Sequence, residues 1–159
     1  MTTRNTGLVA NFEAIPQVAN NAAELAGVLR TASGTVELLA GDSTDNDIVM
    51  LAPIPSNASI PQLFVGADEL GGTCQYNVGL YKTDGTVKDE DVFATAVDVP
   101  AVLADLRFEA ADLNTGSKKL WELAGDSTDP GGYFYVAVTF SATGGTAGTM
   151  NWNIHYIVN

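Results

Sequence analysis

The sequence predicts an all-β protein: a β-sandwich or jelly-roll-like fold of about eight antiparallel strands, with one short helix and an N-terminal arm. Three observations support this fold class. Apolar and polar residues alternate with a period of two in several runs rich in Val, Thr and aromatic residues. Turn residues recur between these runs, and Leu-rich helical repeats are absent. The 159 residues suit a single domain.

The chain divides into an extended N-terminal arm at 1–26 and a β-sandwich domain at 27–159. The arm lacks the β-branched alternation of the rest, and its residues 20–26 fit one short helix. Phe12 and Ile15 are apolar and have no evident partner within the arm. We therefore expect the arm to dock on this domain or on a neighbouring protein.

The first half of the domain contains four strand-like runs. Residues 28–39 fit one strand or a short hairpin about Ser33-Gly34, and a turn at 55–59 separates strands at 47–54 and 60–67. Residues 73–81 alternate most clearly, which is typical of a strand in a two-layer sandwich. One face of this strand is apolar and the other polar; the apolar residues are Cys74, Tyr76, Val78 and Leu80, and the opposite residues are Thr73, Gln75, Asn77 and Gly79.

The second half of the domain begins with an expected helix. Asp84-Gly85 fits a turn, and Asp89 can cap a helix at 90–97 whose apolar residues are Val92, Phe93, Ala96 and Val97. Residues 118–125 fit a strand that carries Trp121. The run at 133–140 fits a strand with an apolar face made of Phe134, Val136, Val138 and Phe140.

The last strand is expected at 150–158. Its inward residues would be Trp152, Ile154, Tyr156 and Val158, and its outward residues Asn151, Asn153 and His155. The Gly-rich residues 141–149 fit the tip of a loose hairpin that joins this strand to the one before it.

The sequence Leu-Ala-Gly-Asp-Ser-Thr-Asp occurs twice, at 39–45 and at 123–129. The flanking residues do not match, which argues against a tandem duplication. Both copies are expected to end one strand and precede another, with Gly41 and Gly125 at positive φ and the Asp and Ser side chains bonded to nearby backbone amides. A calcium loop at 42–47 is the less favoured alternative, because the glycine and distal glutamate of an EF-hand are missing.

The charge and composition exclude several classes of function. A formal charge of −12 and scattered basic residues argue against nucleic-acid binding. The start of the chain lacks the pattern of a signal peptide, and no apolar run approaches a membrane span. The single cysteine, Cys74, favours assembly in a reducing compartment.

The sequence predicts no enzyme, no catalytic residue, no metal site and no cofactor. His155 is the only histidine, and its strand parity places it away from the inward-facing Cys74. Cys74 has no basic neighbour in sequence that would lower its pKa. The acidic residues Asp89, Glu90 and Asp91 are accounted for by the favourable dipole at the start of the expected helix.

Exposed aromatic residues are the remaining binding candidates. By parity, Tyr81, Tyr133 and Tyr135 fall on the polar faces of their strands. Such residues could stack on sugars, but a protein interface, where Tyr is enriched, is the favoured interpretation.

Several segments together resemble a group of small virion proteins of tailed bacteriophages. The matching segments have the order and spacing of that group over roughly residues 27–158, although none is diagnostic alone; they are the turn from Pro55 to Ile60, the Val-Gly-Leu-Tyr run at 78–81, the acidic segment from Asp89 to Asp98, the segment from Leu120 to Val138, and a final Gly-rich hairpin.

The resemblance implies a capsid decoration (cement) protein with a β-sandwich or jelly-roll fold. Such proteins typically sit as homotrimers on the outer face of an icosahedral head and bridge subunits of the major capsid protein. The implied location is the virion surface, after assembly in the host cytoplasm. In this interpretation Phe12, Ile15 and Val18 of the arm insert between neighbouring subunits, and no catalytic residue is implied.

Three other functions compete with this one. A head-fibre or tail-associated domain could bind a host glycan through its exposed aromatic residues. A glycosidase would need two inward-facing carboxylates, which the strands lack. A calcium-dependent adhesion module would melt at a lower temperature in the presence of EDTA.

Overall fold

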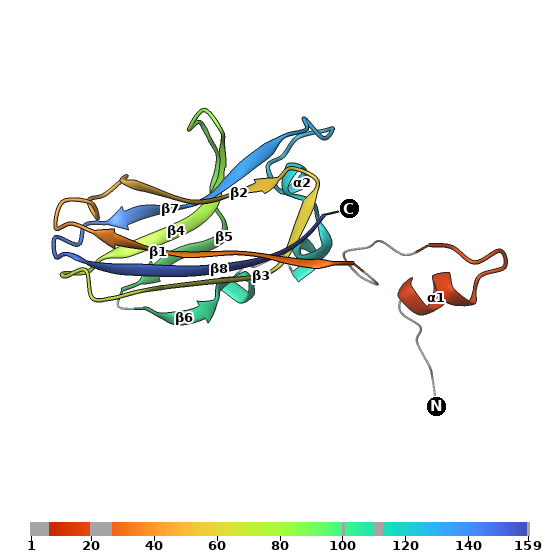
Figure 1. The fold of residues 1–159 in the computed structure, drawn as a ribbon, viewed down its shortest axis with the longest axis horizontal. Helices are drawn as coiled ribbons and strands as arrows, with labels where there is room; N and C mark the ends of the chain where they lie inside the picture. The colour runs from red at the N-terminus through yellow and green to blue at the C-terminus, as the bar shows by residue number, and fades with distance from the viewer. Residues whose placement is uncertain (1–6, 20–26, 100, 110–112, 159) are drawn as a thin grey trace.

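The computed structural model describes residues 7–19, 27–99, 101–109 and 113–158 and shows two packed antiparallel sheets (Figure 1). One sheet has the order β1-β8-β3-β6, and its strands are β1 (Leu29–Leu38), β8 (Gly148–Val158), β3 (Ala58–Ala67) and β6 (Ala101–Asp105). The other has the order β2-β7-β4-β5, and its strands are β2 (Ile48–Pro55), β7 (Tyr133–Ala142), β4 (Gln75–Lys82) and β5 (Val87–Asp98).

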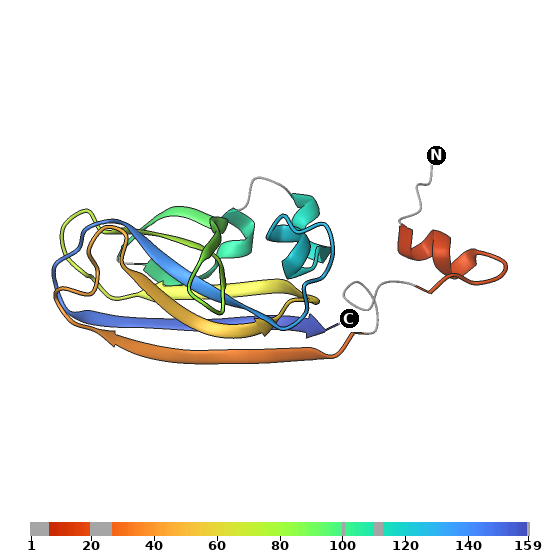
Figure 2. The ribbon, with the colours of Figure 1, turned by 90° about the horizontal axis from the view of Figure 1, so that it is seen from above.

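This strand order is that of a jelly roll. Except at the β4–β5 hairpin, each strand is followed by one in the opposite sheet, so the chain wraps around the sandwich (Figure 2). The prediction of an all-β sandwich of antiparallel strands is confirmed. The core forms where the inner faces of the two sheets meet, as expected for packed sheets with alternating side chains.

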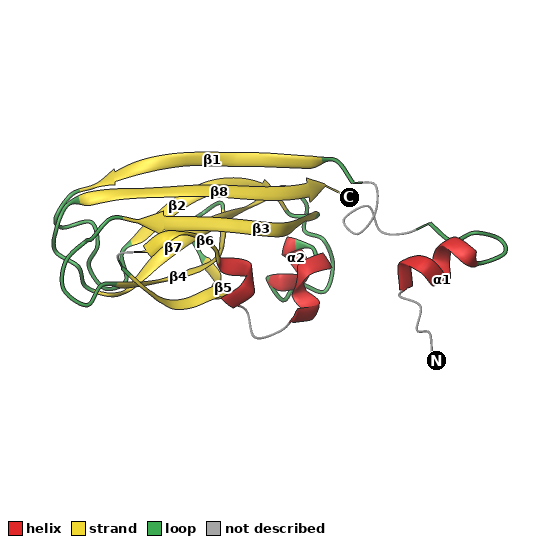
Figure 3. Ribbon diagram, turned by 90° about the horizontal axis from the view of Figure 1, so that it is seen from below, coloured by secondary structure: helices red, strands yellow, loops and turns green. Residues whose placement is uncertain are grey.

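The helices are short, and those that belong to the sandwich lie at one of its ends (Figure 3). They are the 3₁₀ helices η1 (Leu106–Glu109) and η2 (Leu113–Ser117) and the helix α2 (Leu120–Leu123). Helix α1 (Gly7–Glu13) belongs to the N-terminal segment and stands apart from the sheets in all three views. Among the described residues, none of the helices has the length and apolar character needed to cross a membrane.

The predicted apolar faces of the central strands are confirmed. All four predicted apolar residues of β7 and all four at 74–80 are buried, with exposed fractions of 3% or less. They pack against residues of the opposite sheet such as Leu63, Val65 and Ile154, which are completely buried. Burial of each large apolar side chain contributes roughly 1.5–3 kcal/mol, so this layer provides most of the driving force for folding.

The predicted inward face of β8 is also confirmed. Ile154 is buried, and Trp152, Tyr156 and Val158 are half-buried against the core. The ring of Trp152 explains why β1 carries a glycine at position 34. A Cβ atom on Gly34 would lie only 2.7 Å from Cζ2 of Trp152, which is too close for a larger residue. β1 is therefore one continuous strand, and the alternative of a hairpin about Ser33-Gly34 is wrong.

The helix predicted at 90–97 is wrong, because these residues belong to β5. The pairing of β5 with β4 shifts between Leu80↔Asp89 and Val78↔Ala94, which leaves an arch of extra residues on the β5 side. Ala96 takes a φ of 51°, and its amide donates a hydrogen bond of 2.8 Å to Asn77 Oδ1. The apolar spacing that resembled a helix belongs to this irregular strand.

The β5 arch buries the face of β4 that was predicted to be exposed. Asn77 is 7% exposed, and Gly79 is buried beneath the arch. A Cβ atom at Gly79 would lie only 2.1 Å from the carbonyl oxygen of Asp89. The polar face of the predicted strand is therefore an internal surface, and Gly79 permits the close approach of the two backbones.

The strand predicted at 118–125 is also wrong, because α2 occupies this segment. The amide of Lys119 donates to Glu122 Oε2 over 2.8 Å, which closes the start of the helix. Leu120 is completely buried, and Leu123 and Ala124 pack against the core at helical spacing. A single turn of helix is too short for its period to be separated from that of a strand.

The Gly-rich loop at 143–147 does not form the predicted hairpin tip, because β7 and β8 lie in different sheets. The first copy of the repeated heptapeptide holds this loop in place. The amide of Gly144 donates to the carbonyl oxygen of Ser43 over 2.8 Å, and that of Gly145 donates to Ser43 Oγ over 3.3 Å. Ser43 is completely buried, so the two loops form one packed corner of the sandwich.

The two copies of the heptapeptide form turns with different roles. The first joins β1 to β2, as predicted, but the second follows α2 instead of a strand. Gly125 takes the expected positive φ of 75°, whereas Gly41 is not among the residues at positive φ. Asp42 accepts a bond from the amide of Leu39, and Asp129 accepts one from the amide of Gly131. Local turn chemistry accounts for the shared residues.

We predict that Gly79→Ala will destabilise the fold, because the new methyl group collides with the carbonyl of Asp89. The expected loss in the free energy of unfolding is about 1–3 kcal/mol or more, measured by urea denaturation. Gly41→Ala is the matched control, since nothing lies within 4 Å of its Cβ position. Equal stability of the two variants would contradict the close approach of β4 and the β5 arch.

Candidate interaction surfaces

The N-terminal segment exposes two of the three apolar residues that the sequence analysis selected, Ile15 and Val18. The side chain of Ile15 is 100% exposed and that of Val18 is 50% exposed. The amide of Val18 donates to the carbonyl of Asn11 over 3.1 Å, which folds the segment after α1 back on itself. The side chain of Phe12 and the helix considered at 20–26 lie outside the described residues. Exposed apolar residues on a segment that stands apart from the domain are typical of a docking element.

The expectation that Tyr81 is exposed is wrong, since its side chain is only 2% exposed. Its hydroxyl forms a short hydrogen bond with Thr139 Oγ1 on β7. Burial raises the pKa of Tyr81, although the bond to Thr139 acts in the opposite direction. The β5 arch covers this face of the sheet, so Tyr81 holds β4 to β7 and offers no surface to a partner.

The other two tyrosines lie at the start of β7. Tyr133 is 56% exposed, and Tyr135 is half-buried. Tyr135 pairs with Tyr81 on one side and with Pro53 of β2 on the other. The structure therefore separates the candidate binding residues into two groups, the N-terminal segment and the start of β7, with Tyr81 in the interior.

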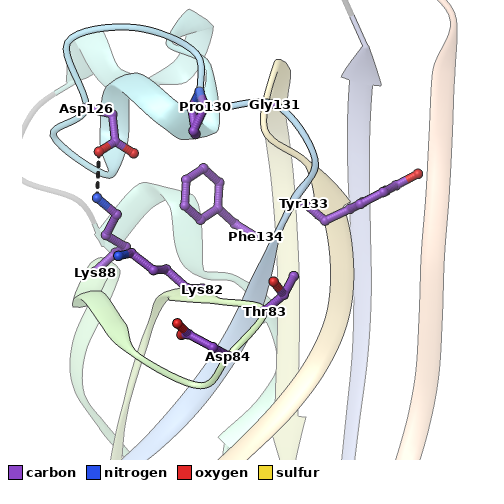
Figure 4. Close-up of a pocket in the computed structure, with 9 residues that line it drawn as sticks. All are labelled: Lys82, Thr83, Asp84, Lys88, Asp126, Pro130, Gly131, Tyr133 and Phe134. Atoms are coloured by element: carbon purple, nitrogen blue, oxygen red, sulfur yellow. Dashed lines mark hydrogen bonds and ion pairs between the residues drawn. The ribbon is translucent and has the colours of Figure 1, made fainter.

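A polar pocket of 280 Å³ lies beside Tyr133, between the β4–β5 turn and the loop that precedes β7 (Figure 4). Lys88 Nζ forms an ion pair of 2.6 Å with Asp126 Oδ1 across it. The Phe134 ring points into the pocket, whereas the Tyr133 ring points away from it. The remaining lining residues are Lys82, Thr83, Asp84, Pro130 and Gly131.

Hydrogen bonds lower the pKa of two acids in this region, Asp84 and Asp129. The backbone amide and the side chain of Thr86 hold the pKa of Asp84 below its usual value. The Ser56 hydroxyl, assisted by the amide of Gly131, does the same for Asp129. Ionised carboxylates accept hydrogen bonds, so these two groups suit binding and turn formation more than proton donation.

The residues considered for catalysis or metal binding, Cys74, His155 and Asp89, lie on different parts of the sandwich and form no common site. Cys74 is 1% exposed, and burial raises its pKa. His155 lies on the outer face of β8, where its Nδ1 atom is 2.8 Å from Gln62 Oε1. Burial, and then the neighbouring Asp91, raise the pKa of Asp89 in β5. Within the described ranges, no group of three or more His, Cys, Asp or Glu side chains is placed to hold a metal ion.

Sequence reasoning missed the polar pocket and the buried Arg107. The Arg107 guanidinium lies 5.1 Å from the centre of the Phe93 ring and donates to Thr115 Oγ1 over 3.3 Å. Burial lowers the pKa of Arg107, which the nearby Asp105 opposes. The contact with Phe93 joins η1 to β5, and the bond to Thr115 joins η1 to η2; no local sequence pattern signals either contact.

The comparisons with known proteins find similarity only among solved structures. No protein-family model matches the sequence, and no curated protein matches it. A chain of the structure described as the cyanophage Pam1 capsid asymmetric unit aligns with a TM-score of 0.50 and 13% identity, over 84% of this chain and 86% of that one. A chain of the acid-stable capsid structure of Helicobacter pylori bacteriophage KHP30 aligns with a TM-score of 0.45 and 14% identity, over 82% and 88%. At 13% identity, the Pam1 similarity shows a shared fold.

We predict that Thr139→Val will lower the free energy of unfolding by about 1–3 kcal/mol, because the buried Tyr81 hydroxyl loses its partner. Adding Tyr81→Phe removes that hydroxyl, so the double variant should recover part of the loss. A double-mutant cycle in urea measures the coupling. Strictly additive losses would contradict a bond between these residues.

We also predict that Ser56→Ala will raise the pKa of Asp129 toward its usual value. A lowered pKa stabilises the folded protein above the unfolded-state pKa, and this stabilisation is lost as the pH falls through the folded-state pKa. The variant should therefore be less stable than the parent at neutral pH, and the difference should shrink in acid. NMR titration of the Asp129 carboxyl group measures the shift, and an unchanged titration curve would contradict the assignment.

Proposed function

We propose that this chain is a structural protein of a bacteriophage virion, and specifically a capsid decoration (cement) protein on the outer surface of the head. The fold that it shares with a chain of the cyanophage Pam1 capsid supports the virion assignment. The observation that carries the decoration role is a closed jelly roll preceded by a segment with a fully exposed Ile15. Jelly rolls of this kind are common among viral capsid domains.

In this proposal the N-terminal arm at 1–26 binds the capsid, and the sandwich at 27–159 lies on the outer surface of the shell. Phe12, Ile15 and Val18 insert between neighbouring subunits of the major capsid protein, and Tyr133 and Tyr135 provide a second contact area. Burial of one Ile side chain contributes roughly 1.5–3 kcal/mol, which is modest for a single contact. Because the capsid repeats the same site many times, linked copies would bind with high avidity.

The charge of the chain fits such a role. A formal charge of −12 keeps the free protein soluble and prevents nonspecific binding to packaged nucleic acid. The proposed location is the virion surface, after assembly in the host cytoplasm. The homotrimer implied by the resemblance remains a prediction about the oligomeric state, and no cofactor is part of the proposal.

One observation favours a second candidate function. Tyr133 is 56% exposed, and its ring points away from the pocket toward solvent, where its face is open for a sugar to stack on. A head-fibre or tail-associated domain that binds a host glycan is therefore the alternative. Binding of a glycan that is abolished by Tyr133→Ala would favour it over the decoration role.

The arm can be tested by deleting residues 1–20. The deletion is expected to leave a folded sandwich that no longer binds capsids of its phage, because the apolar contacts are lost. Ile15→Asp should weaken binding in the same direction by at least tenfold, which corresponds to about 1.4 kcal/mol. Co-sedimentation with undecorated capsids measures both effects.

Val102→Asp is the matched control. Val102 is 85% exposed on β6, so the variant introduces the same change of polarity away from the arm. Undiminished binding by the deletion variant would refute the role of the arm. Failure of the full-length protein to bind any capsid of its phage would refute the decoration role.

A further inference from the structure

The four edge strands of the sandwich differ in how well they are protected from pairing with another strand. β2 contains Pro53 and Pro55, which cannot donate ladder hydrogen bonds, and its pairing shifts between Met50 and Ala52. β5 is interrupted by its arch, and β6 has only 5 residues and a shifted register. Short, bulged or proline-containing edges are the usual means by which proteins avoid edge-to-edge association.

β1 is the exception. Its 10 residues pair with β8 without a register shift, from Leu29↔Ile157 to Leu38↔Gly148, and the strand contains no proline. It is an end strand of its sheet, so within the described part of the chain the backbone groups on its outer side have no ladder partner. Its only charged residues are Arg30 and Glu37, which leave it with no net charge in a strongly acidic chain. β1 is therefore a long, regular edge that another strand can approach without charge repulsion.

Exposed apolar residues lie at both ends of β1. At its start, Val28 is 74% and Leu29 is 54% exposed. Just past its end, Leu39 is 69% exposed, and on the neighbouring β2 Ile48 and Met50 are 43% and 38% exposed. A groove of 410 Å³ lies at this second end, between β1 and β2. Its lining combines the apolar residues Val36, Leu38 and Val49 with the acids Glu37, Asp42 and Asp47, so the basic Arg30 near the start of a second copy's β1 would approach a negatively charged end.

We propose that two copies of this chain pair antiparallel through β1, which joins their four-stranded sheets into one continuous sheet. Antiparallel pairing places the start of one β1 beside the end of the other. Val28 and Leu29 of one copy then lie against Leu39, Ile48 and Met50 of the second, and the exposed apolar groups at both ends of the interface are covered. Because the two strands are identical and antiparallel, the apolar start of each β1 lies beside the apolar end of the other.

A twofold axis together with the fullest overlap of the two 10-residue strands leaves two choices of register. A twofold axis perpendicular to a sheet places a residue opposite its own copy, and here that residue is Ser33 or Gly34. With Ser33 on the axis, Thr31 faces Thr35 of the second copy. With Gly34 on the axis, Ser33 faces Thr35. In both registers Glu37 faces Leu29 or Thr31 and Arg30 faces an apolar residue, so no like charges oppose each other.

In this proposal the partner of the β1 edge is a second copy of this chain, and the pairing does not depend on the proposed function. The contact is isologous, which is the commonest arrangement in homo-oligomers. It differs from the homotrimer implied by the resemblance, and one experiment distinguishes the two. Sedimentation velocity of the full-length chain over a wide concentration range is expected to show a reversible equilibrium between monomer and dimer.

Charge substitutions on β1 test the interface itself. Ser33→Glu with Thr35→Glu places glutamates opposite each other in either register, and should raise the dimer dissociation constant by roughly tenfold or more. Both positions are exposed, so the variant is expected to fold. Ser33→Lys with Thr35→Lys should have the same effect alone, whereas an equimolar mixture of the two variants should form heterodimers.

Thr83→Glu with Thr128→Glu is the control, because it adds the same charge at exposed positions in loops of the other sheet. This control should dimerise like the parent. A parent chain that is monomeric at every concentration, or trimeric, would overturn the proposal, and so would a mixture of charge variants that does not associate. Capsid binding by the Glu variant is measured separately, so loss of the dimer and loss of the proposed function are distinguishable.

Discussion

The packing of β4 and β7 against the opposite sheet is the constraint on which the rest of the molecule depends. Tyr76, Val78 and Leu80 of β4 and the apolar face of β7 are buried against Leu63, Val65 and Ile154. The β5 arch then covers the outer face of β4, so this central strand is enclosed on both sides.

Because the interior is closed, the chain can meet partners only through its periphery. Three peripheral features are distinctive: the exposed apolar residues of the N-terminal segment, the start of β7 beside a polar pocket, and the unprotected edge of β1. In the proposed virion these features divide the work. We propose that the N-terminal segment binds the capsid, that the start of β7 provides a second contact area, and that β1 joins two copies.

The sequence predicted the fold class and the strands whose alternating apolar residues form a buried face, such as 76–80 in β4 and 134–140 in β7. It failed where tertiary contacts override the local pattern. Residues 90–97 have helical spacing but form an arch that packs over β4. Gly79 permits the close approach of the two backbones, and Asn77 accepts a hydrogen bond from the arch. Residues 118–125 were predicted as a strand but contain helix α2, whose residue Leu120 is buried in the core. The exposure of Tyr81 was wrongly predicted for the same reason. Alternation along a strand indicates which face a side chain lies on, but not whether another element covers that face. The β1 edge could not be recognised from sequence, since its significance comes from the strand order of both sheets.

Cryo-electron microscopy of the assembled phage head tests the central claim most directly. We expect density for the jelly roll on the outer surface of the shell, with the N-terminal segment continuing into a boundary between major capsid subunits. Density for this chain at the tip of a fibre or on the inner surface of the shell, or a head from which it is absent, would contradict the account.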